Sequence, residues 1–437
     1  MPLVGFHWVG PALAVASMLV GWRAFKDARG DESNVGFALF IGSVSILLMA
    51  WSNILATRLS LLEGFFGGLD RMYKWHRWFG ALAVGAMWLH TQTIDDVKGI
   101  RGASRDVAKA AEDLAGTGTY LLYALVGISI LRWIPTRWWR LTHKLLVVPY
   151  AFACWHFFTA TKPYANDSAW GRWFLAFMIA GLVAWAYRVV WRDVIRRGRI
   201  HRVRTVESSG DTVTLQLEPL GQPLHYDLGQ FAFLKFRTRG LAEPHPFTIA
   251  SSPEEPVLRF MIRNLGDWTE RLGDKVHPGM RVVVEGPYGR LHPLPSRPAD
   301  NVVWVAGGVG ITPFVGAATS RDRADGPVPH LFYCVKSRDD APGLAALETA
   351  DREGRIILHL HASNDGSRLR ADDLVRTFGS GGLRGAHVVM CGPTSLVKSM
   401  RGVIRELGAR HIHVEGFDIR TGLGPDLSRD IHKLLRR

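Results

Sequence analysis

Four histidines lie in pairs inside two long apolar stretches of this chain, His76 with His90 and His143 with His156. An imidazole in hydrocarbon is costly to desolvate unless its nitrogen meets a metal, a hydrogen-bond partner or a water-lined cavity. In an ideal helix, the step from His76 to His90 rises about 21 Å and returns to within roughly 40° of the same face. Both rings can therefore face one partner helix at two depths. The pattern predicts two haems, one above the other, in a membrane.

The second histidine pair does not fit a straight helix. The step from His143 to His156 would be about 140° out of phase in an ideal helix. Pro149 lies between them, and proline is the usual cause of a bend or a local rewinding. We therefore expect this helix to be distorted around Pro149, so that both rings face the helix of His76. The alternative is that each histidine is satisfied by a backbone carbonyl or by an interfacial water.

Six apolar stretches predict a membrane domain of six helices over residues 1–195. Each stretch approaches the ~20 residues that span a bilayer, and they cover residues 6–22, 35–56, 77–94, 114–134, 141–160 and 170–191. Every tryptophan except Trp268 and Trp304 lies in the first 192 residues, several of them near stretch ends, as an interfacial aromatic belt requires. No basic residue precedes the first stretch, so we expect it to be retained rather than cleaved.

The distribution of basic residues predicts the orientation in a cell membrane. Basic clusters at 71–77, 132–144 and 192–204 should be cytoplasmic, which makes the His76 and His143 level the inner one. The net charge of +14 then belongs to a surface that faces anionic lipid. No nucleic-acid-binding motif accompanies the charge. The three cysteines show neither metal-ligand spacing nor an even set of pairs, so disulfides are not expected.

The second half of the chain predicts two soluble domains. From about Ile200, short alternating strands between turns indicate an antiparallel β-barrel over residues 196–297. Beyond Asp300, strands alternate with helices, which indicates an α/β domain with a parallel sheet over residues 298–437. The predicted strands include Thr212 to Leu217, Phe231 to Phe236, Val302 to Ala306, His330 to Val335, Ile356 to His361 and His387 to Cys391.

Three motifs in the predicted barrel are candidates for binding a flat, phosphorylated ligand. HPFTIASSP (245–253) places a threonine and serines beside an aromatic ring, and its alternative is a strand that ends in a turn. MIRNLGDWTERL (261–272) offers Arg263 and a helix start, which suit a pyrophosphate, although an ordinary capped helix has the same pattern. EGPYG (285–289) gives a tight turn that a ring could approach.

Two glycine-rich motifs are expected to meet at the parallel sheet. VWVAGGVGITPF (303–314) has the order strand, glycine turn and helix, with Thr312 as a cap and Pro313 at the first helical position. Its glycines would admit a dinucleotide phosphate. MCGP (390–393) ends a later strand, and ligands bind at the carboxyl ends of parallel strands. The alternative for Cys391 is a buried small apolar residue.

Arg338 follows a predicted strand, with Lys336 nearby. Its guanidinium could hold a 2′-phosphate, which would favour NADPH over NADH as the donor. The alternative is a solvated surface arginine.

Together, HPFTIAS, IRNLGDWTE, GPYG, GGVGITPF and CGP after paired helix histidines resemble the NADPH oxidases and ferric reductases. The resemblance covers nearly the whole chain. It implies a six-helix domain with two bis-histidine haems b, joined to a ferredoxin-reductase-like module that binds FAD and NADPH. The implied activity moves electrons from cytoplasmic NADPH through FAD and the haems to an acceptor outside.

The family's functional residues can be placed on this sequence by position. The implied haem ligands are His76 with His143 for the inner haem and His90 with His156 for the outer one. The implied FAD contacts are His245, Pro246, Phe247, Thr248, Arg263, Trp268 and Thr269, with the last three at the pyrophosphate. The implied border of the NADPH site is Gly308, Gly310, Thr312, Pro313, Cys391 and Gly392. Phe417, in VEGFDIR, would stack on the flavin and move aside for nicotinamide, so Thr248, Cys391 and Phe417 are the predicted catalytic residues.

The acceptor is left open by departures from the family pattern. Ile94 stands where family oxidases carry a further histidine near the site of oxygen reduction, and their basic residue at the second helix has no evident counterpart. Oxygen, giving superoxide, is the preferred acceptor; a ferric chelate or a partner protein is the alternative. No regulatory module is visible that would require a protein partner. Two other hypotheses are a membrane-anchored flavin reductase without haem, and a non-catalytic haem carrier or sensor.

Overall fold

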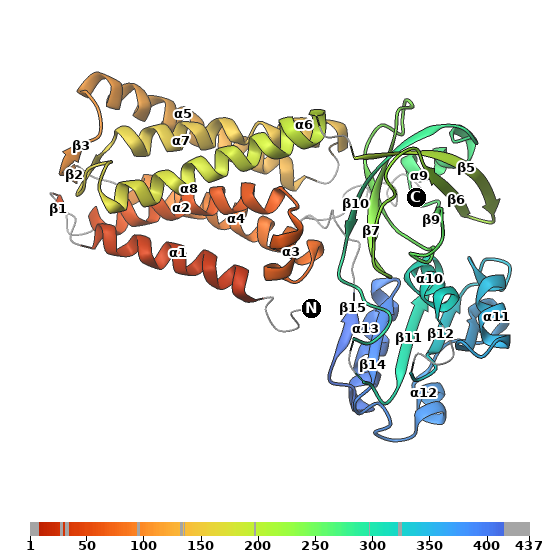
Figure 1. The fold of residues 1–437 in the computed structure, drawn as a ribbon. Coiled ribbons are helices and arrows are strands. Elements are labelled where there is room, and N and C mark those ends of the chain that lie inside the picture. Colours follow the sequence, from red (N-terminus) through yellow and green to blue (C-terminus); the bar gives the residue numbers. More distant parts are fainter. Residues whose placement is uncertain are drawn as a thin grey trace, which may run out of the picture. The chain divides into compact units, whose positions relative to one another are not determined.

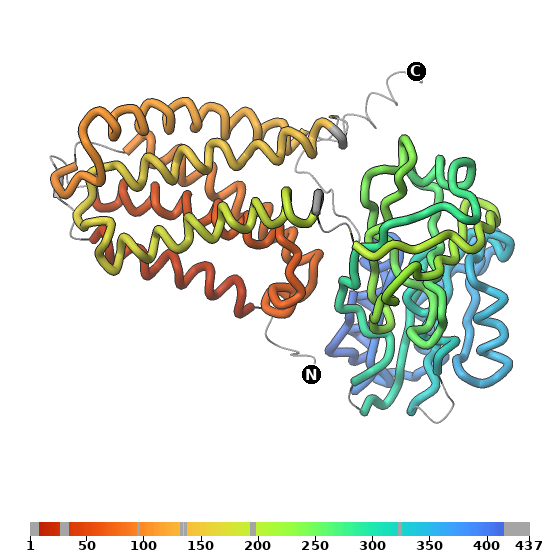
Figure 2. The backbone as a smooth tube through the Cα atoms, turned by 45° about the horizontal axis from the view of Figure 1, so that its top comes forward, coloured from red at the N-terminus to blue at the C-terminus, as the bar shows by residue number. Residues whose placement is uncertain are grey.

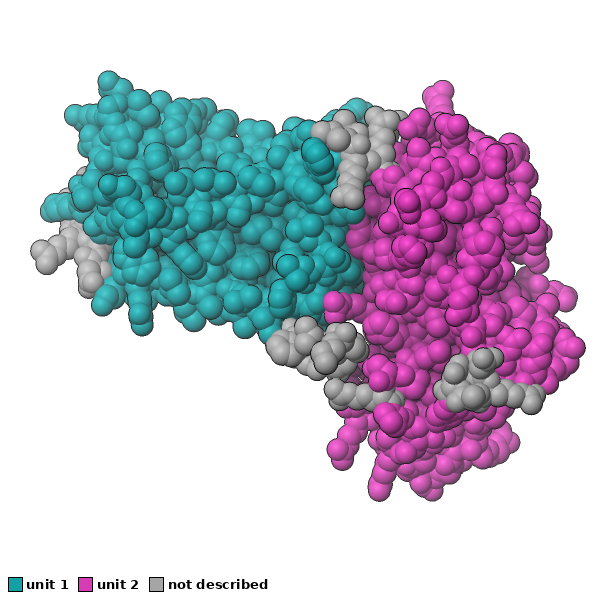
Figure 3. All heavy atoms as spheres, viewed as in Figure 1, with its two compact units in different colours: residues 1, 3–196, 418–437 teal, residues 2, 197–417 magenta. Residues whose placement is uncertain are grey.

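The computed structural model describes residues 8–26, 29–30, 35–93, 97–131, 134, 136–195, 198–296, 298–321 and 326–414. The chain divides into two compact units, which Figure 3 distinguishes by colour. We call residues 3–196 the helical unit and residues 197–417 the sheet unit.

The helical unit contains a helix at each of the six predicted apolar stretches (Figure 1). Its helices are α1 (Val9–Phe25), α2 (Val35–Ala56), the short α3 (Ser60–Phe66), α4 (Leu69–Thr93), α5 (Arg105–Ile130), α6 (Thr136–Lys144), α7 (Val147–Thr159) and α8 (Ala169–Ala186), which continues as the π-helical segment η2 (Tyr187–Ile195). Within the described residues, three helices are long and apolar enough to cross a membrane, at Val35–Ala56, Arg105–Ile130 and Ala169–Arg192. Helices α4 and α5 begin well before the predicted apolar stretches, because helical hydrogen bonding continues through polar turns.

The fifth stretch is broken into α6 and α7, and the break lies just before Pro149. Proline has no N–H for the carbonyl four residues earlier and its ring crowds that carbonyl, which here belongs to Leu145. The backbone tightens there, since Leu146 N donates to His143 O and Val148 N donates to Leu145 O, both across three residues. The predicted distortion is confirmed, at Leu145 and Leu146 rather than at the proline itself.

Two helix pairs build most of the helical unit. Helix α4 packs mainly on α2, where Ser45 Oγ donates to Ala83 O at 2.8 Å. Helix α7 packs mainly on α5, beside which it runs in Figures 1 and 2, and Gly118 of α5 lies against Pro149 and Phe152 of α7. The helices α4 and α7, which carry His90 and His156, therefore belong to different pairs.

Two small antiparallel sheets tie the loops together at the end of the helical unit that carries His90. Strand β1 (Arg29–Gly30) pairs with β2 (Val97–Lys98), and β3 (Ile100–Arg101) pairs with β4 (Thr161–Lys162). We call these four strands the loop cap. The sequence showed no sign of it, because two-residue strands carry no detectable alternation.

An antiparallel sheet of six strands forms the first part of the sheet unit. Its strands are β5 (Arg199–Ser209), β6 (Thr212–Pro219), β7 (Phe231–Phe236), β8 (His245–Thr248), β9 (Leu258–Arg263) and β10 (Arg281–Tyr288), in the order β8-β7-β10-β5-β6-β9. Val213, Leu215 and Leu217 of β6 point into one core, as their alternation predicted. The predicted barrel is not closed by a strand ladder in the described residues, although Ala250 N, just beyond β8, donates to Arg259 O of β9 at 2.8 Å.

A parallel sheet of five strands forms the second part, as predicted. Its strands are β11 (Val302–Gly307), β12 (His330–Val335), β13 (Ile357–Ala362), β14 (His387–Cys391) and β15 (Ile412–Val414), in the order β13-β12-β11-β14-β15. Its helices are α10 (Thr312–Ser320), α11 (Leu344–Arg352), α12 (Ala371–Phe378) and α13 (Thr394–Glu406). Every residue of β11 is buried, as expected for a central parallel strand covered on both faces.

Candidate functional site

The imidazole rings of His76 on α4 and His143 on α6 face each other inside the helical unit. Their ring centroids lie 5.9 Å apart, with 61° between the ring planes. Nδ1 of His76 lies 2.9 Å from Ser52 O and so carries the proton. No hydrogen bond engages Nε2 of either ring within the described residues. Each ring therefore keeps one nitrogen available as a ligand.

Ser129 and Trp139 hold the ring of His143. Ser129 Oγ donates its one proton to Leu125 O at 2.7 Å, so at 3.0 Å from His143 Nδ1 it accepts. The indole of Trp139 stacks on the imidazole at 5.0 Å and 16°, while its N–H donates to Ser129 O. These contacts fix the tautomer in which Nε2 is unprotonated, which is the form a metal requires.

The spacing of the two rings fits a metal held between them. Two metal–imidazole bonds of about 2 Å, with about 1 Å from each nitrogen to its ring centroid, give a centroid separation of about 6 Å. The observed 5.9 Å agrees with that value. His76 and His143 would therefore together be able to hold a haem iron.

His90 and His156 form the second pair. Nδ1 of His90 lies 2.8 Å from Ala38 O, and a Cβ at Gly42 would lie 2.7 Å from the same nitrogen. Helix α2 can therefore approach this ring only because residue 42 is glycine. His156 lies in the last turn of α7, near enough to His90 for the two to interact electrostatically. Its Nδ1 is buried without a hydrogen-bond partner within the described residues.

The backbone carbonyls predicted as alternative partners are present beside two of the four histidines. Ser52 O and Ala38 O each bind an Nδ1. A carbonyl on Nδ1 is the usual outer partner of a histidine that binds metal through Nε2. The same contact therefore serves both interpretations, and the facing geometry favours a metal.

The candidate flavin site begins with three rings packed together on β8 and α9 (Asp267–Lys275). Trp268 lies 4.6 Å from His245 and 5.5 Å from Phe247, centroid to centroid, and is buried in the core of the antiparallel sheet. In the sequence of β8, Pro246 comes between His245 and Phe247. Thr248 is buried at the end of the strand. The Trp268 side chain thus packs against β8. The groups that the start of α9 offers to a ligand are therefore its backbone amides.

Arg263 ends β9 beside the glycine loop of the parallel sheet. Its Nε donates to Asp211 at 2.6 Å, and its Nη1 lies 3.9 Å from where a Cβ of Gly308 would be. Thr269 accepts from Leu265 N and Gly266 N and so closes the turn before α9. The guanidinium of Arg263 thus lies beside the glycine loop.

The two glycine motifs also lie together. Ala306 of β11 pairs with Cys391 of β14, and a Cβ at Gly310 would lie 2.4 Å from Cys391 O. Gly392 packs on Gly307. Cys391 is buried at the end of its strand. The carboxyl ends of two neighbouring parallel strands thus form one close-packed edge, where a dinucleotide is expected to bind.

The predicted cap of the following helix was wrong in detail. The glycines close a short 3₁₀ turn, η3 (Gly308–Ile311), which makes Ile311 the residue before α10. Thr312 is then already helical, and its hydroxyl donates to Val309 O instead of capping the helix. Pro313 lies within the first two helical positions, where its missing N–H costs nothing.

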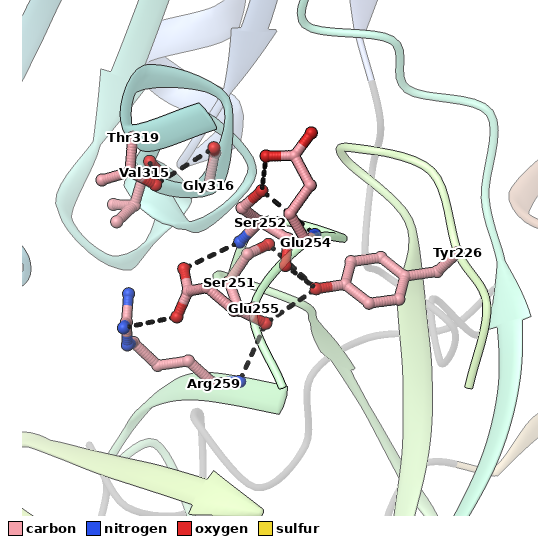
Figure 4. A network of polar contacts seen from close by, with 9 residues as sticks. All are labelled: Tyr226, Ser251, Ser252, Glu254, Glu255, Arg259, Val315, Gly316 and Thr319. Atoms are coloured by element: carbon pink, nitrogen blue, oxygen red, sulfur yellow. Dashed lines mark hydrogen bonds and ion pairs between the residues drawn. The ribbon is translucent and has the colours of Figure 1, made fainter. Parts of the chain in front are cut away.

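A polar network that the sequence did not predict holds the segment after β8 in place (Figure 4). The phenol of Tyr226 lies 2.8 Å from Ser251 Oγ and 2.7 Å from Ser252 O, and burial raises its pKa to about 12, so it stays protonated. Arg259 N donates to Ser251 Oγ. Gly316 of α10 approaches Ser251 O so closely that a Cβ would lie 2.5 Å from it. The two serines at the end of HPFTIASSP were the sequence feature from which this network could have been predicted.

Arg338 is exposed and forms an ion pair with Glu348 of α11. It follows β12 as predicted. Two other sequence predictions, at Phe417 and Ile94, lie outside the described residues.

Three histidines between the parallel sheet and α12 were not singled out by the sequence. His330 Nδ1 lies 3.1 Å from His359 Nε2, and His359 and His361 line a hollow with Asp373 and Arg376. Burial is the main cause, and the neighbouring His359 the smaller one, that lowers the pKa of His330 to about 4. Burial also lowers the pKa values of His359 and His361. These rings are therefore neutral at pH 7.

We expect these histidines to make the parallel sheet sensitive to acid. Their folded pKa values lie below the unfolded value of about 6.5, so the folded state binds fewer protons and loses stability as the pH falls from about 6.5 toward 4. For His330 the loss is about 1–2 kcal/mol after allowance for solvent screening. Hydrogen exchange of β12 and β13 in the intact protein, corrected for intrinsic rates, should accelerate between about pH 7.5 and pH 5. His359→Gln should reduce this dependence; an unchanged dependence would show that other groups cause it.

Comparisons with known proteins agree with the geometry. Family models match three successive segments: "Ferric reductase like transmembrane component" at residues 41–154, "FAD-binding domain" at 196–292 and "Oxidoreductase NAD-binding domain" at 304–402. NADPH oxidase 1 of Rattus norvegicus is 32% identical over 144 residues, which are 32% of this chain and 24% of that protein. The chloroplastic ferric reduction oxidase 7 of Arabidopsis thaliana is 31% identical over 153 residues, 29% of this chain and 20% of that protein.

Among solved structures, an Amycolatopsis cytochrome P450 reductase is 25% identical, with a TM-score of 0.45, 50% of this chain covered and 69% of the other. The alignments to the curated relatives span about a quarter of their length or less. Three family models nevertheless follow one another along this chain in the order of its helical region, antiparallel sheet and parallel sheet. In its three successive regions the chain is thus similar to the NADPH oxidases and ferric reductases, which are membrane oxidoreductases.

Proposed function

We propose that this protein transfers electrons from cytoplasmic NADPH, through FAD and two haems b, to an acceptor on the other side of the cell membrane. The observation that carries the proposal is the pair of facing imidazoles of His76 and His143, in a chain that also matches FAD- and NAD-binding domains. Bound FAD would supply the conversion of a hydride into single electrons, and haem iron would supply one-electron chemistry.

The residues of the chain bind and orient these groups. In the helical region, residues 1–195, His76 with His143 and His90 with His156 would each hold one iron. In residues 196–297, the flavin would contact His245, Pro246, Phe247 and Thr248, with its pyrophosphate at Arg263, Thr269 and the start of α9. In residues 298–437, the nucleotide would lie on Gly308, Gly310, Thr312, Pro313, Cys391 and Gly392. Phe417 is proposed to cover the flavin until the nucleotide arrives.

Oxygen, reduced to superoxide, is the acceptor we propose first. A ferric chelate is the second candidate, because one matched relative is named a ferric reduction oxidase and residue 94 is isoleucine. Purified protein should be given NADPH while oxygen uptake and superoxide-dismutase-sensitive dye reduction are followed together. Oxygen uptake with dismutase-sensitive reduction supports oxygen. Dismutase-insensitive reduction of ferric citrate without uptake would replace it with the chelate.

Absorption spectra test the haems independently of turnover. Detergent-purified protein should show a Soret band that shifts when reductant is added, with about two haems per chain. Protein that reduces dyes with NADPH but lacks that band would be a haem-free flavin reductase. Protein with the band and no NADPH turnover would be a carrier or sensor.

Replacing Arg338 with alanine should weaken NADPH binding more than NADH binding. Loss of one charge-assisted contact to the 2′-phosphate corresponds to about a tenfold rise in KM for NADPH. The KM for NADH should stay within about twofold, because that nucleotide has no such phosphate. Steady-state rates with both nucleotides give these values. Arg352→Ala, also exposed and on α11, is the matched control. Equal changes for the two nucleotides would exclude a 2′-phosphate contact.

A further inference from the structure

Lys162 is a buried cation in the loop cap. It lies in β4, paired across the small sheet with Ile100, and only 2% of the residue is exposed. Burying an ammonium is costly unless its charge is compensated. A lysine kept in such a place is therefore expected to have a specific set of partners.

The partners of Lys162 are the carbonyls at the end of α7. Its Nζ donates to Phe157 O at 2.7 Å, Ala160 O at 3.0 Å and Phe158 O at 3.3 Å. The last carbonyls of a helix lack partners of their own and carry the negative end of the helix dipole. All three ammonium donors are thus used. This terminal turn is the one that carries His156.

The position of the ammonium is fixed by the surrounding cap. Gly99 lies so close to Lys162 O that a Cβ there would be 2.2 Å away, and Gly102 approaches Phe158 O to 2.0 Å by the same measure. Asn166 Nδ2 donates to Phe158 O at 2.8 Å. No carboxylate forms an ion pair with Lys162 in the described part of the chain. Carbonyl dipoles stabilise the charge but do not cancel it, so a net positive charge remains beside the end of α7.

We infer that Lys162 acts through its positive charge on the centre held by His90 and His156. This charge favours the reduced form of that centre. The inference rests on the proposed function. The step it affects transfers one electron from the inner centre, which is oxidised, to the outer centre, which is reduced, and no bond forms or breaks. Reduction adds one negative charge within the field of a buried cation, where the dielectric constant is low.

The inference is tested by a redox titration of the full-length, haem-loaded protein, with the two centres resolved by their absorption. For a charge on the order of 10 Å away and an effective dielectric constant of about 20, Coulomb's law gives about a tenfold change in the reduction equilibrium. Lys162→Gln should therefore lower the midpoint potential of the outer centre by about 59 mV and leave the inner one unchanged. Lys162→Arg should keep the wild-type potential. Lys98→Gln, an exposed lysine of the same cap, is the matched control and should have a smaller effect.

Lys162→Met provides a second neutral variant, with a similar length and no polar head to bury. A neutral variant that keeps both haems and an unchanged outer potential would overturn the inference. Loss of the outer haem in both neutral variants but not in Lys162→Arg would also overturn it, because Lys162 would then only hold the helix end in place. Absence of haem from the wild-type protein would instead refute the proposed function.

Discussion

Replacing His90 with alanine is expected to leave one haem per chain and to stop electron delivery to the acceptor. His90 would supply one of the two nitrogens that hold the outer iron, and α2, whose Gly42 lies against the His90 ring, contains no histidine that could replace it. Loss of the hydrogen-bond partners of metal ligands typically costs about 10–100-fold at a metal site, so loss of a ligand should cost at least about 100-fold in NADPH-driven acceptor reduction.

Reduction of FAD by NADPH should continue at the normal rate in the same variant, since the sheet unit is unchanged. Haem content measured as the pyridine complex, stopped-flow bleaching of the flavin and acceptor reduction separate these steps. His277→Ala, an exposed histidine of the sheet unit, should behave as wild type. Two haems per chain in His90→Ala, or an undiminished acceptor rate, would rule out ligation by His90.

Gly310→Ala is expected to impair the proposed nucleotide site. The added Cβ would lie 2.4 Å from Cys391 O and 2.8 Å from Gly392 Cα, both backbone atoms that cannot rotate away. Overpacking of this kind costs about 1–3 kcal/mol. Because the two glycine motifs form one close-packed edge, we expect the displacement to appear as a fall of roughly 10- to 100-fold in kcat/KM for NADPH.

Chemical reduction distinguishes this defect from unfolding. Dithionite should reduce the haems of Gly310→Ala as it does in wild type, while NADPH reduces the flavin slowly. Gly402→Ala is the matched control: it lies in α13 with open space around its Cα, and alanine favours a helix. A normal NADPH rate in Gly310→Ala would mean that this edge does not bind the nucleotide.

The elements of the sheet unit could be predicted closely from the sequence. β7, β12 and β14 have the predicted bounds, because a buried strand between turns leaves a short apolar run whatever it pairs with. Rules for where a helix begins were less reliable where a capping residue directly follows a glycine-rich turn. Thr312 had the right chemistry for a helix cap, but the preceding glycines formed a 3₁₀ turn and moved the helix start.

Residues whose role depends on distant partners could not be predicted. Trp268 is predicted near a pyrophosphate, and only the fold shows that its ring also packs on His245 and Phe247 of β8. Lys162 was not singled out by the sequence, and only the fold places it on the carbonyls of α7. The network around Tyr226 and Ser251 also joins segments that are far apart in the chain.

By itself, the sequence determined the helices that carry the histidines, the break before Pro149 and the order of the three regions, because periodicity, proline chemistry and turn residues act over a few residues. Only the tertiary structure decided that the rings of His76 and His143 lie 5.9 Å apart, that Ser129 sets the tautomer of His143, and that Gly310 lies directly against Cys391 O. These contacts join residues on different elements. Their distances depend on how whole helices and strands pack, which no local pattern encodes.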